Sequence, residues 1–206
     1  MKSLATLLLI TAAWSFTGCA TRPAANQGLE LMSVAEYEKV VDRHTQRSQK
    51  YSGLYNTMDV TATLVNTAVA KAQLEQKARL LQWDRAQFQL ESNKLAEKNK
   101  NETEVFLSFF TPDKKNDDLQ KKTTQWRVYL EADGRRWEGK TMKIRQPIAE
   151  IQGLFSYHSR FSTPYLITFP VGTATIDPRT TRFIVTGPID IVTLEYAPAA
   201  PSAPAP

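Results

Sequence analysis

The stretch that decides the fold runs from residue 125 to residue 137 and reads Gln-Trp-Arg-Val-Tyr-Leu-Glu-Ala-Asp-Gly-Arg-Arg-Trp. Residues 125–131 alternate between polar and apolar side chains with a period of two, which is typical of a half-buried strand. Asp133-Gly134 favours a type I′ turn, because both central residues of that turn need a positive φ. The pattern therefore predicts a β-hairpin whose returning strand covers residues 136–145.

Further strands are predicted on both sides of this hairpin. Four aromatic-rich or alternating segments have strand character: 104–110, 165–169, 181–186 and 189–195. Residues 54–64 alternate as well, with a Thr-rich outer face, although a helix that starts at Asn56 is an alternative. Most aromatic side chains of the second half are expected in the core. About seven short strands predict a small antiparallel β-sandwich.

Two helices are predicted beside these strands. Ser33 with Glu36 three residues later forms a capping box, which starts a helix over residues 33–50. Residues 66–99 contain neither Gly nor Pro and are dominated by strong helix formers. Their apolar row recurs every seven residues, but its companion positions are mostly not apolar, which disfavours a coiled coil. The fold class expected is α+β, a sandwich with an N-terminal helix and one long inserted helix.

Composition excludes several classes of function. The chain has 206 residues, with 26 Lys and Arg against 21 Asp and Glu. This length fits one folded domain with extensions. The small positive excess has no run of five basic residues, so nucleic-acid binding is not expected. One Cys and two His leave no ligand set for a structural metal and no disulfide within the chain. No Gly-rich phosphate loop is present, and no cofactor is predicted.

The amino terminus has the pattern of a secretory signal. Lys2 precedes an apolar run over residues 4–14, and small residues follow. This run is too short to cross a membrane as a stable helix. Phe16-Thr17-Gly18-Cys19 resembles the lipobox of bacterial lipoproteins, although Phe16 stands where that family usually has an aliphatic residue. The alternative is an ordinary secretory peptide that is cut near Ala20.

The resemblance implies a domain organisation and a location. Residues 1–18 would be the signal peptide, and Cys19 would carry the lipid that anchors the mature chain in the membrane. Ala20, which stands where an Asp would resemble an inner-membrane retention signal, favours the outer membrane, facing the periplasm. Residues 19–32 are then a lipidated tether, and residues 33–196 form a single domain. Residues 197–206 contain four prolines and are expected to be a disordered tail.

Three polar sites are candidates for chemistry: His44, His158 and an acidic-amide loop. His44 lies in a polar stretch and is expected on the solvated surface. His158 has Ser and Thr neighbours, so a hydroxyl could serve as a nucleophile and the imidazole as its base. No Gly-x-Ser-x-Gly nucleophile elbow is present, however, and a loop between two strands is expected instead. The acidic-amide loop of Asp113, Asn116, Asp117 and Asp118 lacks a calcium-site spacing and is expected to be solvated.

The remaining candidate is a binding surface. Arg135, Arg136 and Trp137 directly follow the predicted turn, and exposed Arg and Trp are common in recognition sites. The sequence therefore favours a lipid-anchored envelope protein with a binding or structural role and an envelope protein as its partner. The alternatives are a periplasmic hydrolase around His158 and a carrier of a small ligand or lipid.

Overall fold

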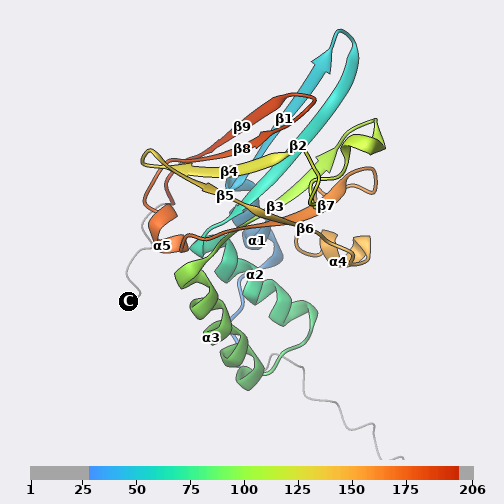
Figure 1. Cartoon of the computed structure of the whole chain (residues 1–206). Helices are drawn as coiled ribbons and strands as arrows, with labels where there is room; N and C mark the ends of the chain where they lie inside the picture. The colour runs from blue at the N-terminus through green and yellow to red at the C-terminus, as the bar shows by residue number, and fades with distance from the viewer. Residues whose placement is uncertain (1–27, 200–206) are drawn as a thin grey trace, which may run out of the picture.

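The computed structural model describes residues 28–199, and the features below refer to that range (Figure 1). One antiparallel sheet has five strands in the order β1 (Thr45–Ser52), β2 (Tyr55–Val65), β3 (Thr103–Phe110), β7 (Thr163–Phe169) and β6 (Lys140–Lys143). The other has four strands in the order β5 (Arg135–Glu138), β4 (Arg127–Ala132), β8 (Thr181–Thr186) and β9 (Ile191–Tyr196). Together with the helices, this arrangement confirms the predicted α+β fold with a sandwich of two sheets.

The main core lies between the two sheets. Along β7 every second side chain is buried, as the period of two requires. Aromatic side chains fill much of the space, among them Phe109, Phe169 and Phe183, which are fully buried. The ring of Phe109 meets that of Trp126 edge to face, with 5.3 Å between centroids. The expectation that most aromatic residues of the second half belong to the core is confirmed.

The Asp133-Gly134 hairpin forms as predicted, but its returning strand is divided between the two sheets. β5 pairs with β4, whereas β6 pairs with β7 of the other sheet. Gly139 lies at the change of sheet, where a Cβ atom would come within 2.5 Å of Ile167 and 2.6 Å of Phe169. A residue without a side chain is required there, because the strand passes directly over the core.

Helices cover the outer face of the five-stranded sheet. They are α1 (Val34–Arg43), α2 (Thr67–Leu80) and α4 (Ile148–Gln152). Under them lies a second apolar cluster, in which the ring of Phe106 stacks on Phe155 with 3.7 Å between centroids. The capping box of Ser33 and Glu36 is present at the start of α1.

The predicted helix over residues 33–50 is wrong in its second half. α1 ends at Arg43, and residues 45–52 form β1, which pairs with β2 along its whole length. β1 has no fully buried residue, so it lacks the apolar alternation that identifies a half-buried strand. The strand predicted over residues 54–64 is confirmed as β2.

The single long helix predicted over residues 66–99 is also wrong. It consists of α2 and α3 (Arg85–Asn101), which lie side by side as a helical hairpin (Figure 1). Between them Gln82 adopts a left-handed φ of 54°, and Asp84 caps α3 by accepting from the Gln87 amide. α2 buries eight residues, whereas α3 buries none, so α3 rests loosely on its neighbour.

Two short elements complete the described chain: η1 (Lys114–Asn116), a turn of 3₁₀ helix, and α5 (Thr173–Ile176). None of the helices in residues 28–199 is long and apolar enough to span a membrane. The predicted signal peptide, the predicted lipobox with Cys19 and most of the predicted C-terminal tail lie outside the described residues. Met32 donates its backbone N–H to Glu75 of α2 at 2.8 Å, so the end of the expected tether contacts the domain.

Candidate functional site

The residues predicted to bind a partner, Arg135, Arg136 and Trp137, lie on β5 at the edge of the four-stranded sheet. The Arg136 guanidinium lies 4.9 Å from the centre of the Tyr129 ring and donates to Glu131 at 2.6 Å. Trp137 is half-buried and packs against the main core. Arg135 is exposed and forms no ion pair with any described residue. Arg136 and Trp137 therefore contribute to the fold as well as to the surface.

His158 lies in a loop, as predicted, but this loop connects α4 with β7 rather than two strands, and the side chain is buried. Its Nδ1 is 2.8 Å from the Ser108 hydroxyl, and its ring meets the Phe106 ring edge to face. Both members of the Ser108–His158 pair are at least nine-tenths buried. Burial lowers the pKa of His158, so the neutral imidazole is favoured. No local pattern predicts this contact, because Ser108 lies 50 positions away on β3.

His44 is also buried, which corrects the expectation of a solvated surface residue. It caps the end of α1 and lies 3.1 Å, by its Nδ1, from the amide nitrogen of Asn66. Burial is the largest cause that lowers the pKa of His44. Asn66 in turn accepts from the Val69 amide and starts α2. The His44–Asn66 contact thus joins two helix ends.

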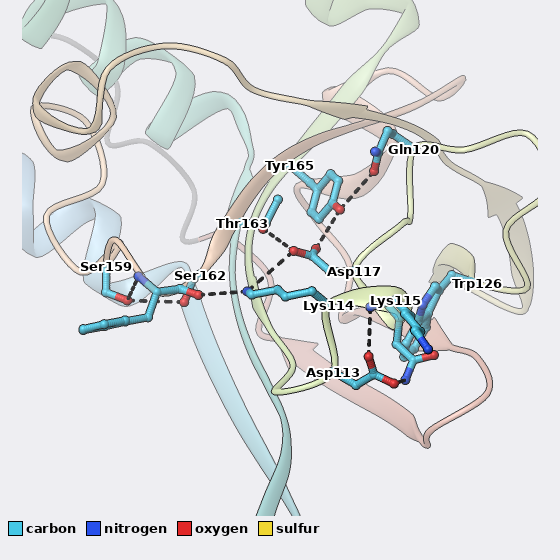
Figure 2. Close-up of polar contacts among 12 residues, drawn as sticks. Asp113, Lys114, Lys115, Asp117, Gln120, Trp126, Ser159, Ser162, Thr163 and Tyr165 are labelled. Carbon is cyan, nitrogen blue, oxygen red and sulfur yellow. Dashed lines mark hydrogen bonds and ion pairs between the residues drawn. The ribbon is translucent and has the colours of Figure 1, made fainter.

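The acidic-amide loop is exposed at Asp113, as predicted, but Asp117 is held against β7 (Figure 2). The Asp117 carboxylate accepts from the Thr163 hydroxyl at 2.5 Å and from the Tyr165 hydroxyl at 2.9 Å. Its side chain is only 7% exposed. Burial and the Asp117 carboxylate both raise the pKa of Tyr165, which keeps its hydroxyl as a donor. Asp117 is a structural contact of the loop.

Lys114 reaches across the same cluster. Its Nζ lies 3.8 Å from the Asp117 carboxylate and 3.5 Å from the carbonyl oxygen of Phe161 (Figure 2). Asp113 caps the backbone of Lys115, so its carboxylate is also engaged. Within residues 28–199, no three His, Cys, Asp or Glu residues are grouped so that they could hold a metal ion.

A cleft of about 210 Å³ lies between α2 and α3. The ion pair of Lys98 and Glu104, at 2.5 Å, lines it. Desolvation lowers the pKa of Lys77 at the same cleft, while Glu104 acts in the opposite direction. The buried amide nitrogen of Gln73 has no hydrogen-bond partner among the described residues. The cleft has both apolar and charged lining residues, among them Leu74, Leu95 and Lys77.

The two most exposed large apolar side chains of the described residues, Leu54 and Tyr55, lie with Tyr51 at the tip of the β1–β2 hairpin. Leu54 is 97% exposed, Tyr55 81% and Tyr51 58%. Gly53 makes the turn with a φ of +60°. In Figure 1 this hairpin extends well beyond the neighbouring strands. Single exposed apolar residues are ordinary, but three within five positions on a protruding tip form a contact surface.

Comparison with known proteins gives no relative. No family model matches the chain, and neither a curated protein nor a solved structure matches it.

Proposed function

We propose that the protein is a lipid-anchored envelope protein with a binding or structural, accessory role. In this proposal Cys19 holds the chain at the outer membrane, and the folded domain binds an envelope protein on the periplasmic side. The observation that carries the binding role is the apolar tip of the β1–β2 hairpin, defined by Tyr51, Leu54 and Tyr55. These side chains are among the most exposed large apolar groups of the described chain.

The position of the tip supports this role. Arg85, at the start of α3, donates to the carbonyl oxygen of Gly28, so the described chain begins beside the α2–α3 turn. That turn and the hairpin tip lie at opposite ends of the domain (Figure 1). β2, which leads to the tip, has 11 residues and is about 36 Å long, because each strand residue advances the chain by about 3.3 Å. The nine Cα-to-Cα steps from Cys19 to Gly28 reach about 30 Å when fully extended. A domain standing on this tether presents the tip away from its anchoring membrane.

The energetics of the tip suit a contact with a protein. Full burial of a Leu side chain contributes about 1.5–3 kcal/mol. Tyr is favoured at interfaces because its ring is apolar and its hydroxyl can form a hydrogen bond. Leu54 with two flanking Tyr residues therefore combines an apolar anchor with an amphipathic rim. Arg135 remains a second predicted contact, since it is exposed and forms no ion pair with the described residues.

The two alternatives have less support. A hydrolase centred on His158 would need access to the Ser108–His158 pair, and both residues are buried under an aromatic ring. A carrier would need a hollow sandwich, and fully buried aromatic side chains occupy the space between the sheets.

The anchor is tested by mass spectrometry of the mature protein. The N-terminal peptide is expected to begin at Cys19 and to carry two or three acyl chains, because stable anchoring takes more than one. Cys19→Ser is expected to abolish the modification and move the protein from the membrane to the soluble fraction. An unmodified mature chain that begins elsewhere would refute the lipid anchor.

The binding role is tested by site-specific photo-crosslinking in intact cells. A photoreactive residue at position 54 is expected to capture a discrete envelope protein, whereas one at position 81, exposed on the α2–α3 turn, serves as the matched control. Tyr51→Ser with Tyr55→Ser should remove the position-54 product without changing the thermal midpoint. Equal products at both positions, or none at position 54, would contradict a role of the tip.

A further inference from the structure

An open groove follows the outer edge of β6. It has a volume of about 720 Å³, within the range of specific binding sites. Its walls come from β6, from the segment 144–146 that leaves the sheet, and from Gln120 of the preceding loop. The chain leaves β4 at Gly139, after β5, and continues as β6 in the five-stranded sheet. The groove lies along the edge that this change of sheet leaves open.

The backbone along this groove has unpaired positions. Gly139 donates to Val128 of β4, and Ile144 donates to Pro164 of β7. Antiparallel strands alternate between residues that bond to the neighbour and residues that face away from it. Since the β6–β7 register pairs Met142 with Leu166, the backbone groups of Thr141 and Lys143 face the groove. No other strand of the described chain pairs with that edge.

The floor of the groove is apolar and uncovered. Met142 and Leu166 are direct neighbours across β6 and β7 and lie on the same face. Met142 is 57% exposed, because α1, α2 and α4 cover β2 and β3 but leave this edge open. Apolar floor positions with outward backbone groups are the features that accept an added strand.

The rim of the groove is cationic. Lys140, Lys143 and Arg145 are exposed, and none of them forms an ion pair with a described residue. No acidic residue occurs between positions 139 and 149. Lysines on an edge strand commonly prevent unwanted pairing with other strands. The same charges attract a strand that carries carboxylates on alternate positions.

We propose that this groove binds an extended acidic segment of a partner protein, which pairs with the outer edge of β6. The segment's backbone would satisfy Thr141 and Lys143, its apolar side chains would cover Met142, and its carboxylates would face Lys143 and Arg145, which lie on the opposite face from Met142. A second copy of this chain is disfavoured, because two β6 edges would bring like charges together. A lipid surface cannot satisfy alternating backbone donors and acceptors. The inference extends the proposed function to the chemistry of a partner, yet it does not depend on the anchor or the tip.

The test uses the full mature protein in detergent and a labelled peptide of eight residues that alternates Val with Glu. Fluorescence anisotropy is expected to show saturable binding, and hydrogen exchange is expected to slow at the amides of Thr141 and Lys143. A peptide that alternates Val with Lys should bind at least about tenfold more weakly. Protection elsewhere on the chain without protection of β6 would overturn the assignment.

Two variants test separately how much the backbone hydrogen bonds and the charges of β6 contribute to peptide binding. Thr141→Pro removes an outward N–H, which an edge strand tolerates, and it should abolish binding. Lys143→Glu with Arg145→Glu should weaken the acidic peptide at least about tenfold and improve the basic one. Lys71→Glu, at an exposed position on α2, is the matched control and should change neither.

Thermal unfolding followed by circular dichroism shows whether each variant folds. If Thr141→Pro does not fold, the variant with Lys143→Glu and Arg145→Glu still tests the proposal. Equal affinity of the wild type and the charge variant would refute the proposal. Binding to vesicles of phosphatidylglycerol and phosphatidylethanolamine without binding of the acidic peptide would also refute it. Dimers that form through β6 in the absence of peptide would refute it as well. Loss of the Cys19 lipid would leave the peptide result unchanged, so the two proposals fail separately.

Discussion

At Gly139 the absence of a side chain allows one strand to leave the four-stranded sheet and enter the five-stranded sheet. Gly139→Ala places a methyl group within 2.5 Å of Ile167, inside the packed core. We expect a loss of about 1–3 kcal/mol in the free energy of unfolding, because overpacking forces neighbouring side chains out of their rotamers. Urea unfolding measures this change.

The matched control for Gly139→Ala is Gly53→Asn. Nothing lies within 4 Å of a Cβ atom at Gly53, and Asn tolerates the positive φ found there. The free energy of unfolding of Gly53→Asn should stay within about 0.5 kcal/mol of the wild-type value, as for other substitutions on the surface. Equal losses at both positions would show that backbone entropy, and not packing at Gly139, sets the cost.

His158 predicts a pH dependence of stability. Burial lowers its pKa in the folded protein below the usual value of about 6.5. The unfolded chain therefore binds a proton more readily, and stability is lost as the pH falls from about 6.5 toward the folded-state pKa. The free energy of unfolding should decline between pH 7 and pH 5.5, as measured by urea titrations.

His158→Asn separates this effect from other titrating groups. Asn can place a polar atom near the Nδ1 position that contacts Ser108, but it does not titrate. The variant should be less dependent on pH over the same range, with the remaining slope due to His44. An unchanged slope would assign the pH dependence to other groups.

Among single residues, sequence reasoning succeeds where the contact is local. The capping box of Ser33 and Glu36 and the turn at Asp133-Gly134 involve residues a few positions apart, and both are present. The partners of His158 and Asp117 lie 46 to 50 positions away along the chain. Their burial therefore could not be predicted from neighbouring residues.

At the scale of elements, the break between α2 and α3 has a local cause. Leu81-Gln82-Trp83-Asp84 contains neither Gly nor Pro, which hides the break, yet Asp84 followed by Gln87 is a helix-start signal. β1 was missed for a different reason. Its side chains are polar on both faces, so only its pairing with β2 makes it a strand.

The left-handed Gln82 gives a prediction for this turn. A non-glycine residue in that conformation costs about 1–2 kcal/mol. Gln82→Gly should therefore raise the free energy of unfolding by about 0.5–1 kcal/mol, after the larger entropy of the unfolded Gly chain is counted. Gln82→Val should lower it, because a β-branched residue fits that conformation poorly. Thermal unfolding of both variants measures the signs, and a loss for Gln82→Gly would contradict the argument.

At the scale of the whole molecule, the two sheets share one core and should unfold together. Tyr196 of β9 donates its hydroxyl to the carbonyl oxygen of Ala62 on β2 at 2.8 Å, which links the sheets directly. In a chain without residues 1–18, which contain Trp14, the variant with Trp83→Phe and Trp137→Phe leaves Trp126 as the fluorescent probe of the folded core. Its fluorescence and the helical circular dichroism should change at one denaturant midpoint. Two separate midpoints would show that the helical layer unfolds by itself.

The sequence by itself determined the class of fold, the Asp133-Gly134 hairpin and the position of most strands, because periodicity and turn chemistry act between neighbouring residues. It also carries the lipobox resemblance at Cys19, which stays a prediction. Tertiary structure alone decided that residues 136–145 serve two sheets and that residues 45–52 form a strand, whereas the start of α3 at Asp84 also has a local signal. The tertiary structure also decided which residues form the β6 groove and the exposed tip. These features depend on contacts between segments that are distant in the sequence. The free energy of such contacts cannot be predicted from the pattern of neighbouring residues.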